Sequence, residues 1–202
     1  MSKPKAGPFV CSGDFAALFG AAAALRGAET AQKSKMQEPT RMIDFEHVSK
    51  AYKKGDHLAL DDVSLHITSG EFVFLLGHSG AGKSTLLKLI LREEKPTSGK
   101  VFVDGKNVAA LRRSQIPYLR RQMGIIFQDF RLIPSMTVYE NVAFAMHVTN
   151  IARKEIRERV PYMLELVHLE DKANVYPQYL SGGEQQRVAI ARALAHAPKL
   201  VI

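Results

Sequence analysis

Cysteine and long hydrophobic runs are what the sequence most lacks. Its single thiol, Cys11, cannot form a disulfide within the chain and cannot supply the clustered cysteines of a zinc site. No stretch approaches the roughly 18 apolar residues that a membrane-spanning helix needs. A disulfide-stabilised secreted domain, a cysteine-ligated metal site and a membrane-embedded subunit are therefore not predicted, and a reducing compartment fits the composition.

Internal repeats and long runs of like charge are also absent. The formal net charge is +8, and six basic and three acidic residues in 1–41 account for part of it. The rest of the positive excess is spread along the chain. The pairs Arg112-Arg113 and Arg120-Arg121 are more typical of solvated helix faces than of a lipid or nucleic-acid patch. We therefore predict no nucleic-acid partner.

The first 41 residues differ from everything that follows. A basic start and an alanine-rich apolar run over 15–25 resemble a secretory signal, but Asp14 interrupts its flank. We predict a disordered or loosely helical extension over 1–41. Regular hydrophobic patterning begins at Met42, which is a candidate for the natural start. One large domain is predicted over 42–202.

A glycine-rich loop organises the domain. It reads Gly77-His78-Ser79-Gly80-Ala81-Gly82-Lys83-Ser84-Thr85, which fits the pattern G-x-x-x-x-G-K-[ST]. The apolar run 72–76 before it predicts a buried strand, and 86–91 after it predicts a helix with Lys88 turned outward. Strand, loop and helix in this order are the context in which such a loop binds phosphate.

The chemistry of this loop follows from its residue types. Its three glycines permit positive φ, so successive backbone N–H groups can converge on an anion. The helix that follows directs its positive end at the same point. Lys83 can reach the outer phosphates of a nucleotide, and the hydroxyl of Ser84 can ligate Mg²⁺. We expect every residue from Gly77 to Thr85 to contribute to a nucleotide site.

Alternating strand-like and helix-like segments fill the rest of the domain. Period-two and apolar patterns predict strands, and capping-box spacing at Thr137 and Glu140 predicts a helix start. The expected strands are 43–48, 63–67, 100–103 with a turn at 104–105, 124–127, and one that begins at 199. The expected helices are 137–145 and 153–167, the second burying Ile156, Val160, Met163, Leu164 and Val167.

A second glycine motif, Leu180-Ser181-Gly182-Gly183-Glu184-Gln185-Gln186, precedes a helix over 187–194. Ser181 and Glu184 have the spacing of a capping box, which explains a helix start. It does not explain two adjacent glycines, since each weakens a helix by up to about 1 kcal/mol. They fit an anion that approaches the bare backbone. One nucleotide rarely needs both this helix start and the phosphate loop from the same subunit.

Together the two motifs resemble the ATP-binding cassette (ABC) family of nucleotide-binding domains, over residues 42–202. The resemblance implies an α/β fold: a P-loop NTPase core of ABC type, with an antiparallel β subdomain and a helical subdomain that carries the second motif, and with the C-terminal part missing. It implies ATP and Mg²⁺ as cofactors. It also implies that two copies pair head to tail, so that each ATP lies between one copy's phosphate loop and Ser181, Gly182, Gly183 and Glu184 of the other.

Three further positions match the family one at a time. Tyr52 lies where members stack an aromatic ring on adenine, although a half-buried strand tyrosine is the plainer explanation. Gln128 matches the glutamine that approaches Mg²⁺ and the attacking water, so it is the predicted catalytic residue and a second metal ligand. His78 occupies a variable loop position and is expected to contribute its backbone.

Within the family, the resemblance is greatest to the cell-division branch. It rests on residues 45–52, 77–83, 120–124, 127–132 and 137–142. It implies a homodimer bound to an integral membrane subunit of the FtsX type at the cytoplasmic face of the inner membrane. Subunits of lipoprotein-release, macrolide-export or amino-acid-import transporters remain alternatives, as do a soluble ABC protein of DNA repair or translation and a non-catalytic scaffold.

The family places an Asp and a catalytic Glu just after the strand that begins at 199, whereas this sequence ends at Ile202. We therefore expect ATPase activity in the full-length parent and little or none in this chain alone. We also expect uncovered apolar surface at 72–76 and 124–127, and marginal stability.

Overall fold

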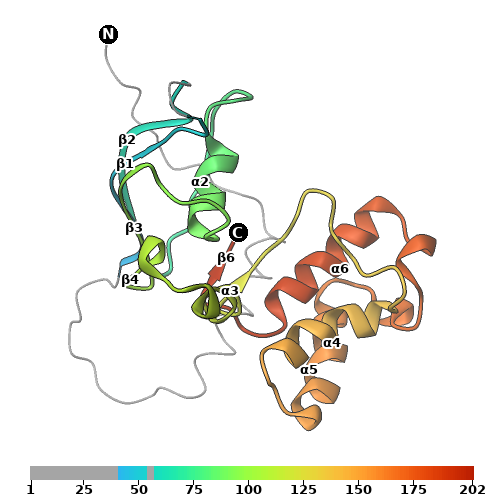
Figure 1. The fold of residues 1–202 in the computed structure, drawn as a ribbon. Helices are drawn as coiled ribbons and strands as arrows, with labels where there is room; N and C mark the ends of the chain where they lie inside the picture. Colours follow the sequence, from blue (N-terminus) through green and yellow to red (C-terminus); the bar gives the residue numbers. More distant parts are fainter. Residues whose placement is uncertain (1–40, 54–56) are drawn as a thin grey trace. The chain divides into compact units, whose positions relative to one another are not determined.

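The computed structural model describes residues 41–53 and 57–202, which form two compact units (Figure 1). One, the sheet unit, comprises the described residues up to 125 together with 199–202. The other, the helical unit, comprises 126–198. The predicted extension over 1–41 lies outside the described residues, apart from Arg41, which begins the first strand.

An antiparallel sheet is the main element of the sheet unit. Its strands are β1 (Arg41–Lys50), β2 (Leu60–Thr68), β3 (Ser98–Val103) and β4 (Lys106–Asn107), in the order β2-β1-β3-β4. Phe45 and Val48 of β1 are buried, and Phe45 pairs with Leu65 on one side and Val101 on the other. These strands confirm the period-two predictions and the antiparallel β subdomain.

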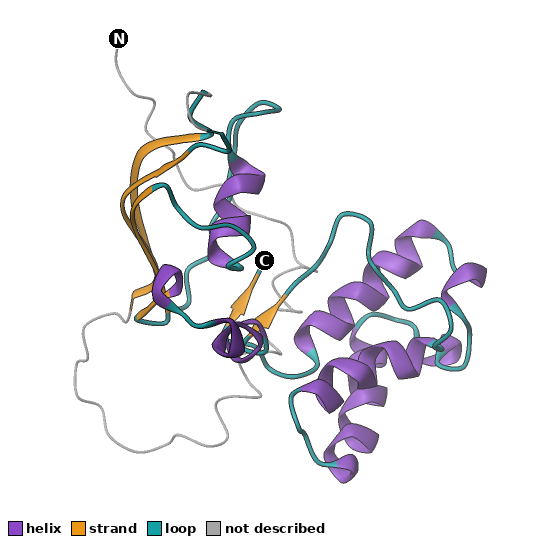
Figure 2. Ribbon diagram, viewed as in Figure 1, coloured by secondary structure: helices purple, strands orange, loops and turns teal. Residues whose placement is uncertain are grey.

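Helix α2 (Lys83–Ile90) packs on one face of this sheet (Figure 2). Leu86, Leu89 and Ile90 are buried in the same cluster as Phe45 and Val101. Lys88 is exposed, as predicted. Shorter elements follow in the chain: η1 (Val108–Ala110), η2 (Arg113–Gln115), α3 (Ile116–Arg120), and β5 (Met123–Gly124), which pairs in parallel with β6 (Leu200–Val201).

Three helices make up most of the helical unit: α4 (Val138–Val148), α5 (Arg153–Leu166) and α6 (Gly182–Leu194), with the short turns η3 (Glu170–Lys172) and η4 (Pro177–Tyr179). The capping box at the start of α4 is confirmed, because Thr137 Oγ1 accepts from the backbone N–H of Glu140 at 3.2 Å. The helix runs three residues past its predicted end at Ala145. The predicted apolar face of α5 is buried.

The buried strand predicted at 72–76 is wrong. These residues adopt no regular structure, and their side chains are exposed, from 41% at Leu75 to 86% at Leu76. Among the described residues no strand pairs with them, and a strand needs a neighbour to satisfy its N–H and C=O groups. The uncovered surface expected at this segment is therefore confirmed. The strand predicted at 124–127 is shorter, since β5 ends at Gly124. The uncovered surface expected at 124–127 is wrong, because Gly124 is buried and the next three residues are half-buried.

None of the helices in the described part of the chain is both long and apolar enough to cross a membrane.

Candidate functional site

The phosphate loop enters α2 through a glycine that no other residue can replace without strain. Gly82 is the N-cap of α2 at φ 88°, a left-handed conformation. A Cβ at this position would lie 2.4 Å from the carbonyl oxygen of Ala59 and 2.8 Å from the side chain of Leu60. Gly80 is also left-handed at φ 83°, whereas Gly77 is not, so two of the three loop glycines use positive φ.

The first N–H groups of α2 have no acceptor among the described residues. No side chain caps this helix and its first turn holds no acidic residue. The first intrahelical bond of the new helix runs from the N–H of Leu86 to the carbonyl of Gly82. The N–H groups ahead of it have no carbonyl within the helix, and they carry its positive end. Free N–H donors at the positive end of a helix can bind a phosphate or a carboxylate.

Lys83 already crosses the loop. Its ammonium donates to the carbonyl of His78 at 2.8 Å and also to the carbonyl of Gly77. Two of its three N–H donors are thus engaged, and one is left for an anion. The ring Nδ1 of His78 lies 2.8 Å from the carbonyl of Ser79, so this side chain is bound to its own loop.

Tyr52 lies on the same helix start, although it is far away in sequence. Its hydroxyl is 3.1 Å from the Thr85 hydroxyl, 33 positions along the chain. The residue is 49% exposed, and the ammonium groups of Lys50 and Lys88 lie 5.2 and 5.9 Å from the centroid of its ring. A half-exposed ring beside the phosphate loop can stack on a base.

Sequence reasoning missed the partly buried ion pair behind this tyrosine. Lys50 is 8% exposed and donates to Glu94 at 2.8 Å, which lowers the pKa of that carboxyl. The contact joins β1 to the segment after α2. It is too distant in sequence for any local pattern to have indicated it.

The second motif forms the start of α6, in the helical unit. The Ser181 hydroxyl donates to the Glu184 carboxylate at 2.8 Å and accepts from the Glu184 N–H at 3.3 Å, while the N–H of Ser181 donates to the same carboxylate at 2.7 Å. The backbone N–H of Ser181, and then its hydroxyl, hold the pKa of Glu184 below its usual range. The capping box predicted from spacing is confirmed.

Nothing in the described part of the chain requires glycine at the two glycine positions of this motif. Neither Gly182 nor Gly183 adopts positive φ. A Cβ at Gly182 would meet nothing within 4 Å, and one at Gly183 would meet only the end of the flexible Arg187 side chain, at 3.8 Å. Alanine would fit both positions and stabilise the helix. Close approach from outside is the physical reason left for glycine here.

Gln128 is exposed, in a loop that α6 holds in place. Two and three residues after it, Phe130 and Arg131 adopt positive φ, and Arg192 of α6 donates to both of their carbonyls at 2.6 Å. Burial lowers the pKa of this guanidinium. The fully buried Asn141 holds the next stretch of the loop through the N–H and carbonyl of Ile133. Sequence reasoning identified neither Arg192 nor Asn141.

The predicted site residues thus form two groups. Tyr52 and the phosphate loop belong to the sheet unit, whereas Gln128 and the start of α6 belong to the helical unit. The approach of Gln128 to the loop remains a prediction.

The two predicted metal ligands, one in each unit, are oxygen donors of the kind that Mg²⁺ takes. No group of three or more His, Cys, Asp or Glu side chains gathers in the part of the chain that the structure describes. The Ser84 hydroxyl is exposed at the start of α2, and Gln128 carries an amide oxygen. Mg²⁺ commonly takes one or two protein oxygens and completes its shell with phosphate oxygens and water.

Comparison with known proteins agrees with this geometry. The family described as ABC transporter matches residues 60–202. The cell division ATP-binding protein FtsE of Bacillus subtilis is 49% identical over 161 residues, which cover 80% of this chain and 70% of that protein. The methionine import ATP-binding protein MetN 2 of Bacillus cereus is 46% identical over 80% of this chain and 48% of its own length.

A solved structure shows the same likeness. The dimeric ATP-binding cassette MJ0796, in a post-hydrolysis state bound to ADP and Pi, is 41% identical with a TM-score of 0.71, over 79% of this chain and 72% of that chain.

Proposed function

Because the chain belongs to the ABC transporter family of ATP-binding domains, we propose that it is the ATP-binding subunit of a membrane complex of bacterial cell division. Two copies pair head to tail with ATP and Mg²⁺ between them. Hydrolysis of ATP to ADP and phosphate drives an integral membrane subunit of the FtsX type, at the cytoplasmic face of the inner membrane.

The observation that carries the proposal is the contrast between the two helix starts. The start of α2 lacks a cap and an acidic residue, so it can hold the phosphates by itself. The start of α6 has two glycines whose missing side chains leave open space in its own copy. A nucleotide held by α2 of a second copy would approach that space.

Each residue then has a defined task. Tyr52 stacks on adenine, and the N–H groups of the loop and the ammonium of Lys83 bind the phosphates. Ser84 and Gln128 hold Mg²⁺, and Gln128 orients the attacking water. From the other copy, Ser181 and the N–H groups of the glycines complete the phosphate shell.

Site-directed crosslinking tests the head-to-tail pair. In a background that lacks the natural Cys11, Ser79→Cys in one copy and Ser181→Cys in the other should form a disulfide when a non-hydrolysable ATP analogue is present. Both positions are exposed, and so is Ser135, which gives a control pair in which Ser135→Cys replaces the change at 181. Equal yields from the two pairs, or a yield that nucleotide does not change, would contradict the proposal. Lys83→Ala should abolish the nucleotide effect.

Methionine import is the second candidate, because the relative named for that role is nearly as similar. Depletion of the protein in its host separates the two. Filamentous cells that grow equally on scarce and abundant methionine support the cell-division role. Cells of normal length that fail only on scarce methionine support import instead.

A further inference from the structure

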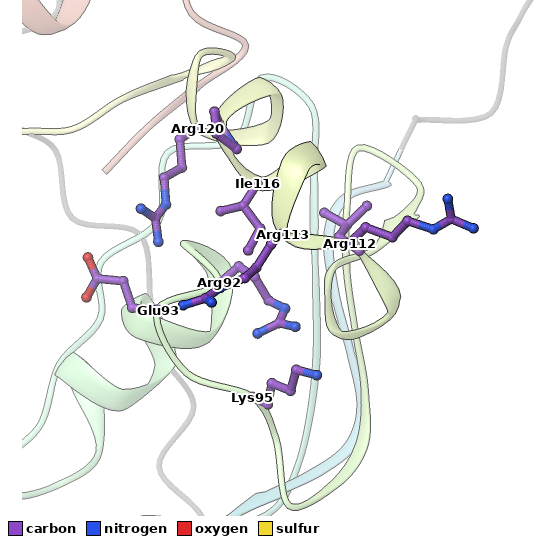
Figure 3. A pocket seen from close by; sticks show the side chains of 9 residues that line it. Arg92, Glu93, Lys95, Arg112, Arg113, Ile116 and Arg120 are labelled. Carbon is purple, nitrogen blue, oxygen red and sulfur yellow. The ribbon is translucent and has the colours of Figure 1, made fainter.

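A basic hollow lies at the end of α2 that is opposite the phosphate loop. Its volume is about 800 Å³, and Arg92, Lys95, Arg112, Arg113 and Arg120 line it with a single carboxylate, Glu93 (Figure 3). The eight residues of α2 separate it from the loop by about 12 Å, at 1.5 Å per residue. It is therefore not part of the proposed nucleotide site.

Two of the guanidinium groups are held in fixed positions by backbone carbonyls. Arg92 follows α2 at φ 56° and donates through Nε to Val108 at 2.7 Å and through Nη2 to Ala109 at 3.4 Å. Arg120 donates through Nε to Leu91, at the end of α2, at 2.9 Å. Their remaining N–H groups have no protein acceptor among the described residues. The two guanidinium groups are therefore held in orientation while some of their hydrogen-bond donors stay free.

The other three cations have no structural task that the described residues reveal. The side chains of Lys95, Arg112 and Arg113 make no hydrogen bond or ion pair within 41–53 and 57–202, and all three are exposed. Neutralising the negative end of α2 explains Arg92 and Arg120. It does not explain Lys95 and Arg113, which bring further positive charge to the same hollow, whereas the side chain of Arg112 extends away from it (Figure 3).

We propose that this hollow is a second anion site, which takes a ligand with two or more phosphate groups. Planar guanidinium forks on separate elements match phosphate oxygens in pairs. In Figure 3 the side chains of Arg92, Arg113 and Arg120 reach into the same space, from the end of α2, from η2 and from α3. The volume lies within the range of small-ligand sites. The ligand is either a soluble polyphosphate or the headgroup of an anionic phospholipid.

Calorimetric titration with pyrophosphate tests the site. All variants carry Lys83→Ala, which weakens phosphate binding at the loop. Lys95→Gln with Arg113→Gln removes two charges from the hollow, and Lys100→Gln with Lys106→Gln removes two exposed charges elsewhere in the sheet unit. The double variant in the hollow (the hollow pair) should lower the affinity for pyrophosphate at least tenfold, and the double variant elsewhere (the control pair) should lower it less than twofold. Pyrophosphate binding to the hollow should also weaken as the salt concentration rises.

Vesicle sedimentation identifies the source of the phosphate. Binding to phosphatidylglycerol vesicles but not to phosphatidylcholine vesicles, lost in the hollow pair alone, identifies a lipid headgroup. Pyrophosphate binding without vesicle binding identifies a soluble ligand. Equal effects of the two variant pairs, or no binding of either probe, would overturn the proposal. Failure of the proposed nucleotide site gives a different result: Lys83→Ala would leave ATP binding unchanged.

Discussion

Replacing Gly183 by alanine should change stability and pairing in opposite directions. The glycine lies in the first turn of α6 at a helical φ, and the space around an added Cβ is open except for the end of Arg187 at 3.8 Å. Alanine is about 0.5–1 kcal/mol more favourable than glycine in a helix. No clash offsets this gain, so the free energy of unfolding should rise by about that amount.

The same methyl group should weaken the nucleotide-bound pair. In the proposed complex the phosphates approach the bare backbone at this point, and a Cβ would hold them away from the N–H donors. Loss of one or two hydrogen bonds to a charged group costs about 1.5–3 kcal/mol each, so pairing affinity should fall at least tenfold.

Two measurements separate these effects. Urea unfolding followed by circular dichroism reports the stability, and sedimentation velocity with a non-hydrolysable ATP analogue reports the pairing. Glu158→Ala, at an exposed position of α5, is the control and should change neither by more than about 0.5 kcal/mol. A variant that pairs as tightly as the original chain would refute the reason given for the glycines. A variant that is less stable than the original chain would refute the claim that a methyl group at position 183 fits without a clash.

Further predictions concern single contacts. Arg192→Met leaves two carbonyls without their donor and should lower the free energy of unfolding by about 2–4 kcal/mol in urea, whereas Arg192→Lys should recover part of the loss. Asn141→Leu removes all four hydrogen bonds that the Asn141 side chain makes to the segment before α4 and should cost about 2–3 kcal/mol by the same assay. Gly82→Ala forces a methyl against the Ala59 carbonyl and should abolish binding of a fluorescent ATP analogue. The pKa of Glu184 is lower in the folded chain than its usual 4.5. The ionised carboxylate therefore stabilises the fold fully above pH 4.5, and this stabilisation is lost as the pH falls through the pKa of the folded state. Glu184→Gln should make stability less dependent on pH in this range, as followed by circular dichroism during an acid titration.

The sequence predicted best those features of the structure that depend on residues close together in the chain. The capping boxes at Thr137 and Ser181 join residues three positions apart, so spacing alone located both helix starts. The buried face of α5 follows from a period of 3.6 residues. Two of the three glycines in the loop over 77–85 adopt the positive φ that its residue types predicted, and this too is a local property.

What the sequence did not predict depends on distant partners. The run 72–76 is apolar enough for a strand, but a strand also needs a neighbour, and composition cannot supply that information. Arg192 holds carbonyls 61 and 62 positions away, and Lys50 pairs with a carboxylate 44 positions away. An arginine within a helical pattern looks the same whether it faces water or holds a loop.

The side-chain charges at the two helix starts also differ, and for the proposed complex this difference predicts an order of events. At the start of α6 the Glu184 carboxylate lies 3.9 Å from the ammonium of Lys172, so these two side chains add little net charge that could attract an anion. The start of α2 has no carboxylate, and Lys83 adds a positive charge beside it. A free nucleotide should therefore bind first at α2, where attraction is uncompensated. Only when the phosphates are fixed there, with part of their charge neutralised, can the glycines of α6 in a second copy bind them. In the proposed complex, nucleotide binding should therefore precede pairing, and the pair should form only once ATP is bound.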